Sequence, residues 1–253
     1  MDLVQLIKDE AVRRPIFLQR SNTRSFALEV DDSLTIFVNP NRLSTSNAKL
    51  KDILIFDTPA GKGFCHNCKS CEKDCYAKAQ QVFYPTVPMY RYVNLFLVEK
   101  RPGLLMGLID RQLSAMRKRI TVCRIHSSGD FYSQHEVAFW DRFIHNHPEL
   151  TFYAYTKVEE LFDFSCIENN GNFNLIRSMI AHEGKCYRNF GSLEYVQRIA
   201  TLTGGYLCPA TMKETKGTVK CNRDCHYCLT GNKPIFLIHG QGRNVVNRKG
   251  VEK

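Results

Sequence analysis

The chain has 253 residues, with 35 Lys and Arg against 25 Asp and Glu, so its formal net charge at pH 7 is +10. Hydrophobic residues make up 43% of the sequence and charged residues 24%, which is typical of folded soluble proteins and excludes a disordered or fibrous chain. No apolar run reaches the ~18 residues of a membrane span, and the N-terminus is typical of an amphipathic helix rather than a signal peptide. We therefore expect a cytoplasmic protein with no membrane partner.

The first half of the chain is predicted to contain, in order, a helix, short strands, a buried strand, a cysteine-rich loop and a second helix: residues 2–13, 25–38, 52–56, 61–76 and 104–116. The loop is inferred from its two glycines and four cysteines. A further helix is expected to begin near Cys75, and Pro85 and Pro88 are expected to break the stretch that follows it.

The second half is predicted to alternate between strands and helices. Strands are expected at 120–126, 150–155, 173–179 and 234–239, and helices at 133–146 and 157–164. Alternation of this kind indicates βαβ units and a parallel sheet. We therefore predict a single α/β domain over 1–253, in an open or partial TIM-barrel-like arrangement, with a C-terminal cysteine-rich segment at 205–230 and a basic tail at 240–253.

Polar residues follow two of these strands, in the stretches 126–130 and 155–157. Ligands of parallel α/β sheets bind beyond the carboxyl ends of the strands, so both stretches should face one crevice. His126, Asp130 and Lys157 are the candidate catalytic residues there. The alternatives are a buried core role for His126, a helix N-cap for Asp130 and a solvated position for Lys157.

Four aromatic residues near this crevice are expected to belong to the core: Phe131, Tyr132, Phe139 and Trp140. A base-stacking platform is the alternative. The basic balance, with a pI of about 9.1, suggests nucleic acid as a partner, although solvated surface charge explains each basic cluster equally well.

Eight of the eleven cysteines fall into two groups, Cys65, Cys68, Cys71 and Cys75, and Cys208, Cys221, Cys225 and Cys228. The first group has the x2, x2, x3 spacing of bacterial ferredoxins, with Tyr76 in place of the usual proline. The last three cysteines of the second group have the x3, x2 spacing of radical S-adenosylmethionine enzymes, but they lie close to the C-terminus, and Cys208 offers a fourth ligand. Thiolates at such spacings favour soft metals.

Three interpretations of these cysteines stay open. They hold two iron–sulfur sites, or one iron–sulfur site and one structural zinc, or two zincs with His66 or His226 as occasional ligands. An odd cysteine count without a signal peptide argues against a disulfide framework.

Several motifs occur in a fixed order along the chain: Ser70–Ala77, Arg91-x2-Asn94, Arg124–Phe131, Phe152–Lys157 and Cys208-Pro209. Together with the terminal cysteines they resemble the gene product 88 family of phages and bacterial mobile elements, over about residues 20–230. Members look like relatives of radical S-adenosylmethionine proteins. The resemblance implies that the loop ending in Cys75 and Tyr76 holds the main cluster. It also implies that the turn formed by Ser127, Ser128, Gly129 and Asp130 lines the cofactor pocket.

The first functional hypothesis is therefore an enzyme with a reactive [4Fe–4S] cluster on Cys68, Cys71 and Cys75 and an auxiliary site on the C-terminal cysteines. It would cleave S-adenosylmethionine reductively, draw electrons from an external donor, and abstract hydrogen from a substrate such as a nucleotide or nucleic acid. One of the four cysteines of the loop is surplus, Cys65 in this assignment or Cys75 if Cys65 takes its place, and would ligate elsewhere or stay free. The alternatives are a metal-stapled nucleic-acid-binding protein without catalysis and an electron-transfer protein.

Overall fold

The computed structural model describes residues 2–19, 25–45, 50, 52–68, 75–177, 197, 201, 204–209, 218–219, 221, 224–230 and 234–235. Cys71, Cys186 and the basic tail at 240–253 lie outside these residues. Within the described ranges, no helix is long and apolar enough to cross a membrane.

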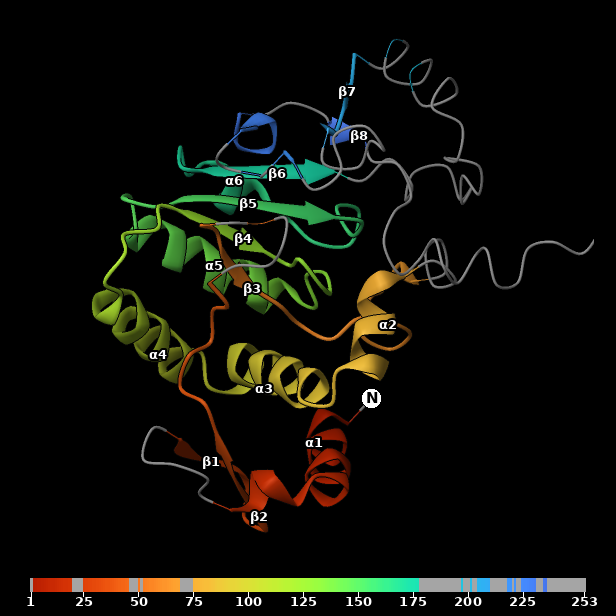
Figure 1. Ribbon diagram of the computed structural model, residues 1–253, viewed down its shortest axis with the longest axis vertical. Coiled ribbons are helices and arrows are strands. Elements are labelled where there is room, and N and C mark those ends of the chain that lie inside the picture. Colours follow the sequence, from red (N-terminus) through yellow and green to blue (C-terminus); the bar gives the residue numbers. More distant parts are fainter. Residues whose placement is uncertain are drawn as a thin grey trace, which may run out of the picture.

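A four-stranded parallel sheet forms the centre of the fold (Figure 1). Its strands are β3 (Leu54–Phe56), β4 (Val122–Ile125), β5 (Thr151–Thr156) and β6 (Phe173–Arg177), and they lie side by side in chain order. One cross-strand row runs through Ile55, Arg124, Tyr153 and Asn174. The predicted mixed α/β class and parallel sheet are confirmed, and the described strands do not close into a barrel.

Helices cover one face of this sheet. They are α2 (Tyr76–Phe83), α3 (Val87–Lys100) and α4 (Pro102–Ala115) between β3 and β4, α5 (Gln134–Asn146) between β4 and β5, and α6 (Ser165–Glu168) before β6. The main hydrophobic core lies between the helices and the sheet, and Phe131, Phe139 and Trp140 are completely buried in it. Tyr132 is partly buried against the same core, so the predicted core role of all four aromatic residues is confirmed.

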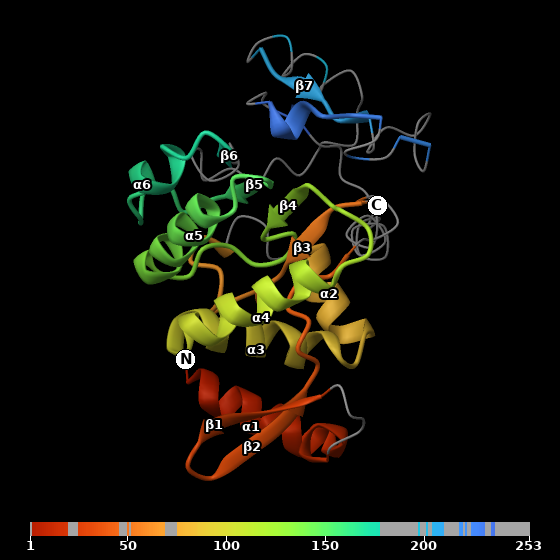
Figure 2. The same cartoon turned by 90° about the vertical axis from the view of Figure 1, so that its left-hand side faces the viewer.

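The N-terminal elements form a separate layer beyond α3. They are α1 (Leu3–Arg13), the 3-10 helix η1 (Pro15–Leu18) and the antiparallel hairpin of β1 (Phe26–Asp31) and β2 (Leu34–Val38). Figures 1 and 2 show this layer at one end of the molecule and strands β7 (Tyr206–Leu207) and β8 (Pro234–Ile235) at the other. The predicted helix at 2–13 and the short strands in 25–38 are confirmed.

The second face of the sheet is covered by the C-terminal cysteine segment. A smaller hydrophobic cluster there contains Ile55, Tyr153 and Ile176 from the sheet, and Cys221, Cys228 and Leu229 pack against it. Cys228 lies in the 3-10 helix η5 (Tyr227–Leu229), which contacts β5 and β6. The two cysteine groups therefore approach the sheet from different sides. The first group lies at its carboxyl edge, and the second lies on the face that the helices leave uncovered.

Two expectations about helices were wrong. The expected break at Pro85 is present between α2 and α3, but Pro88 causes none: residues 87–100 form helix α3, with Pro88 in its first turn, where a missing amide costs no hydrogen bond. Residues 157–164 form turns, with Leu161 N bonded to Val158 O, because the Lys157 amide and carbonyl are both taken up by contacts to other loops. Of the strand expected at 234–239, only Pro234–Ile235 lies within the described residues.

Candidate functional site

The cysteine-rich loop leaves β3 at its carboxyl end and returns to the fold at α2. Gly61 has a φ of 111°, and its carbonyl accepts from the amides of Phe64 and Cys65 at 3.1 and 3.0 Å. The buried Phe64 ring lies 5.6 Å from the Tyr92 ring, which fixes this part of the loop to α3. Cys68 is buried, and its amide donates to Cys65 O. The two thiols are therefore carried on a folded, anchored turn.

Side chains of the loop and of α2 also bind backbone oxygens that follow β4 and β5. These hydrogen bonds join Asn67 to Lys157 O, His66 Nε2 to Tyr132 O, and the Tyr76 hydroxyl to Ser127 O. The cysteine loop thus lies directly against the carboxyl edge of the sheet, where ligands of parallel α/β folds bind.

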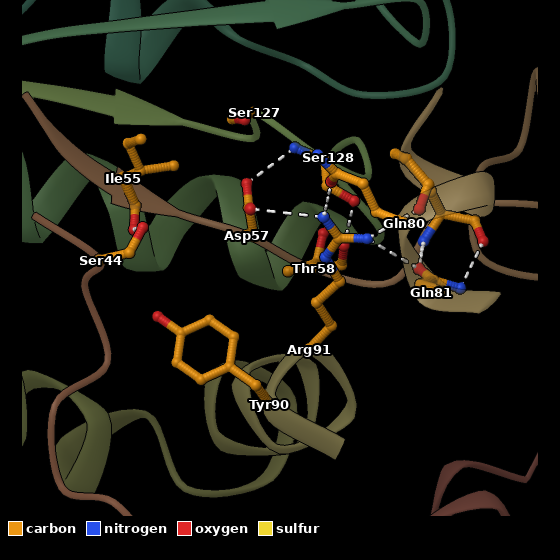
Figure 3. Close-up of polar contacts among 12 residues, drawn as sticks. Ser44, Ile55, Asp57, Thr58, Gln80, Gln81, Tyr90, Arg91, Ser127 and Ser128 are labelled. Carbon is orange, nitrogen blue, oxygen red and sulfur yellow. Dashed lines mark hydrogen bonds and ion pairs between the residues drawn. The ribbon is translucent and has the colours of Figure 1, made fainter. Parts of the chain in front are cut away.

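The two ends of the loop are held together by α2 and α3 (Figure 3). Gln81 of α2 accepts from Ala60 N at 2.8 Å and donates to Ala60 O at 3.3 Å. Arg91 of α3 donates to Ala77 O and to Gln80 Oε1, and one of its nitrogens lies 3.6 Å from a carboxylate oxygen of Asp57. These contacts close the loop at its base.

Replacing Gln81 by alanine is expected to open this base. The change leaves the Ala60 amide and carbonyl without their side-chain partner, at a cost of about 1 to 3 kcal/mol. Limited trypsin digestion should then cut faster after the exposed Lys62 than in the wild type. Gln80→Ala is the control, because Gln80 contacts Arg91 but has no bond to Ala60. If Gln81→Ala were cut after Lys62 no faster than Gln80→Ala, a closing role for Gln81 would be contradicted.

The turn after β4 binds the end of β3 through a close network. Asp57 accepts from the Ser128 amide at 2.7 Å, the Ser128 hydroxyl donates to Thr58 O at 3.0 Å, and Thr58 N donates to Ser128 O at 3.1 Å. Gly129 has a φ of 84°, and a Cβ atom there would lie 2.1 Å from Thr58 Oγ1. The Ser-Ser-Gly-Asp motif therefore requires glycine at position 129.

His126 is a completely buried member of the same network. Its Nδ1 lies 3.1 Å from Thr58 Oγ1 and its Nε2 lies 3.2 Å from Glu136 Oε1, and both side chains of that ion pair are fully excluded from solvent. Burial lowers the pKa of His126, but the carboxylates of Glu136, Asp130 and Asp57, with Glu136 acting most strongly, together hold the pKa above its ordinary value. The geometry favours the core role for His126 over acid–base catalysis.

Asp130 joins the turn after β4 to the end of β5. Its Oδ1 accepts from Thr156 Oγ1 and from the Phe131 amide, and its Oδ2 accepts from the Lys157 amide, each at 2.9 Å. Burial raises the pKa of Asp130. The charge of His126 and these hydrogen bonds act to lower the pKa, but burial outweighs them. The expected proximity of the two strand ends is thereby confirmed. The expectation that Asp130 caps α5 was wrong, because the N-cap is Ser133, whose side chain accepts from Glu136 N.

The C-terminal cysteines come from two segments that meet beside the sheet. Cys221 and Cys225 pair through a backbone bridge, and the Tyr206 ring, two residues before Cys208, stacks 3.7 Å from the Tyr227 ring. Cys228 accepts a hydrogen bond from the Tyr155 hydroxyl at 2.8 Å. Burial, followed by the neighbouring Cys228, raises the pKa of Tyr155 well above its ordinary value. The hydroxyl therefore stays protonated throughout the neutral range and can donate this hydrogen bond.

The donor chemistry of both cysteine groups fits a soft metal, because all eight candidate ligands are thiols on short, turn-rich segments. In the described ranges, no three His, Cys, Asp or Glu side chains are already arranged to hold a metal ion. Cys71, which belongs to the first group, lies outside those ranges.

Sequence reasoning missed the residues that close the loop. Gln81 carries no recognisable motif, and Arg91 and Asn94 were noted only as part of a resemblance. Asn94 donates to Asp57 O at 2.9 Å, so α3 is hydrogen-bonded directly to the residue that follows β3. The one signal available was polarity inside an apolar helix, since Arg91 and Asn94 are buried.

Comparison with known proteins places the chain in a family. The family model described as Gene product 88 matches residues 35–202. The Gene 88 protein of Mycobacterium phage L5 is 32% identical over 110 residues, which cover 40% of this chain and 46% of that protein, so the match spans less than half of the relative's length. No solved structure matches significantly. Since the family model covers more than half of its 253 residues, the chain belongs to the gene product 88 family.

Proposed function

We propose that this protein is an iron–sulfur enzyme that resembles radical S-adenosylmethionine enzymes, with its reactive cluster on the loop 61–76 and an auxiliary metal on the C-terminal cysteines. The observation that carries the proposal is the place of the loop. Cys65 and Cys68 lie on an anchored turn against the carboxyl edge of a parallel sheet, and Asn67 between them binds the backbone that follows β5. Thiols at that edge can meet a ligand bound beyond the strands.

When bound, such a cluster supplies an electron for the reductive cleavage of S-adenosylmethionine, with the electron drawn from an external donor. The chain's own contribution is positional. Gln81 and Arg91 hold the ends of the loop together, and Tyr76 ties the start of α2 to Ser127. Ser128 and Asp130 lie at the adjoining strand ends, with their side chains committed to neighbouring backbone and side-chain groups.

The site is also separated from the run of three basic residues Arg117, Lys118 and Arg119. Residues 117–119 precede β4, at the amino edge of the sheet, and Lys118 binds Asp52 at 2.6 Å. That cluster therefore lies at the edge opposite to the cysteine loop, and the proposal rests on the cysteines rather than on surface charge.

The first test is the iron, acid-labile sulfide and zinc content of protein purified without oxygen. We expect iron and sulfide in cluster proportions in the wild type, and the loss of the share held by the first loop in Cys68→Ala and Cys71→Ala. Cys166→Ala is the matched control, since Cys166 is exposed on α6 and lies outside both cysteine groups. A spectral change on adding S-adenosylmethionine to the reduced protein would then indicate an open iron.

Two results would overturn the proposal. Full retention of iron and sulfide in Cys71→Ala would remove the first loop from the cluster site. Zinc alone, in colourless protein, would remove the radical chemistry and leave a metal-stapled binding protein.

A further inference from the structure

One cysteine of the C-terminal group is bound by two strands of the sheet. The Tyr155 hydroxyl of β5 donates to Cys228 Sγ at 2.8 Å, and the Asn174 side chain of β6 donates to Cys228 O at 2.7 Å. Asn174 thus binds the backbone of Cys228, and Tyr155 binds its sulfur. Both donors come from rigid strands, so the position of the sulfur is set by the sheet.

A cation lies beside this contact. The guanidinium carbon of Arg124 is 4.9 Å from the centre of the Tyr155 ring and 5.9 Å from that of Tyr153. Its Nε is buried and has no hydrogen-bond partner among the described residues. Arg124 as a whole is half-buried, and a cation that is partly withdrawn from water is stabilised by negative charge close to it.

A metal-bound thiolate at Cys228 would supply a strong hydrogen-bond acceptor for Tyr155 and negative charge near Arg124. It accepts hydrogen bonds through sulfur, and a metal centre with four thiolates carries net negative charge. Outer groups that hydrogen-bond a ligand fix its orientation and tune the metal. A plain thiol at Cys228 would be a weak acceptor for Tyr155 and would bring no negative charge toward Arg124.

We propose that Tyr155 and Arg124 are positioning residues for a metal-bound thiolate at Cys228, with Tyr155 donating a hydrogen bond to the sulfur and Arg124 balancing the negative charge of the centre. This inference rests on the proposed metal at the C-terminal cysteines. It adds that the metal centre is coupled to the parallel sheet through β4 and β5, the strands whose carboxyl ends bind the first cysteine loop.

The test compares Tyr155→Phe with Tyr153→Phe in the full chain. Both changes remove a phenol hydroxyl from the same face of β5, but within the described part of the chain only the Tyr155 hydroxyl is bonded to a thiol. Each variant is loaded with zinc, and separately with cobalt(II), whose thiolate-to-metal charge-transfer absorption reports on the sulfur ligands. The share of metal that is lost in Cys228→Ala defines the C-terminal site. Transfer of this share to a chelator is then followed in time.

In Tyr155→Phe we expect the same metal stoichiometry, about tenfold faster transfer to the chelator, and a shifted charge-transfer band. Tyr153→Phe should match the wild type in all three. A Tyr155→Phe protein that releases metal at the wild-type rate with an unshifted band would overturn this inference and leave the proposed metal site intact. Unchanged metal content in Cys228→Ala would instead overturn the C-terminal site, and this inference with it.

Discussion

Gly129→Ala is expected to destabilise the protein by about 2 to 5 kcal/mol, because an alanine pays for both a left-handed backbone and a steric clash. The φ of Gly129 is 84°, and the added Cβ would lie 2.1 Å from Thr58 Oγ1 and 3.0 Å from the carbonyl oxygens of Thr58 and Pro59. Backbone carbonyls cannot rotate away as a flexible side chain can. The free energy of unfolding, measured in urea, checks the size of the effect.

The control for this prediction is Gly107→Ala. Gly107 lies inside α4, and a Cβ there would meet nothing within 4 Å. Alanine at this position should be neutral or should stabilise the protein by about 0.5 to 1 kcal/mol, because it favours the helix. If Gly129→Ala were as stable as the control, the turn after β4 would not pack against β3 as described.

Glu136→Ala is the second change with a large expected effect, at about 3 to 5 kcal/mol of lost stability. Glu136 Oε1 lies 3.2 Å from His126 Nε2 with both side chains completely buried, and Glu136 Oε2 accepts from Tyr132 N at 2.8 Å. Removing the carboxylate leaves the imidazole without its ion-pair partner in the core. Glu136→Gln separates the two losses, because an amide can still accept from Tyr132 N but carries no charge.

The chain offers an exposed pair for comparison. His147 Nε2 lies 3.0 Å from Asp110 Oδ1, but the Asp110 side chain is 48% exposed. Because solvent screens that pair, Asp110→Ala should cost less than about 1 kcal/mol. Urea unfolding of both variants measures the contrast, and similar losses in the two would argue against a buried, charged His126–Glu136 pair.

The same pair sets a pH dependence. The pKa of His126 is raised in the folded protein, because the carboxylates of Glu136, Asp130 and Asp57 together outweigh the effect of burial, with Glu136 acting most strongly. Its contribution to stability is therefore complete below the unfolded pKa of about 6.5 and is lost as the pH rises through the higher folded value. Unfolding free energies measured above neutral pH should fall in the wild type and fall less in Glu136→Gln.

Much of the fold could be predicted because its signals are local. The strand at 120–126, the helix at 133–146 and the strand at 150–155 each have a clear period of apolar residues, and the structure has β4, α5 and β5 there. Helix α3 escaped prediction for the opposite reason. Nine of its 14 residues are buried, so its apolar positions do not form a single stripe along one side.

The candidate site divides in the same way. The sequence by itself determined the two groups of thiols, the polar strand ends and the glycine at position 129, because spacing and residue type are written in the chain. Only the tertiary structure decided which side chains those groups meet. Gln81 closes the loop, Glu136 pairs with His126, and Tyr155 and Arg124 lie beside Cys228. Such contacts join residues far apart in the chain, and they form only when the helices and the C-terminal segment pack onto the sheet.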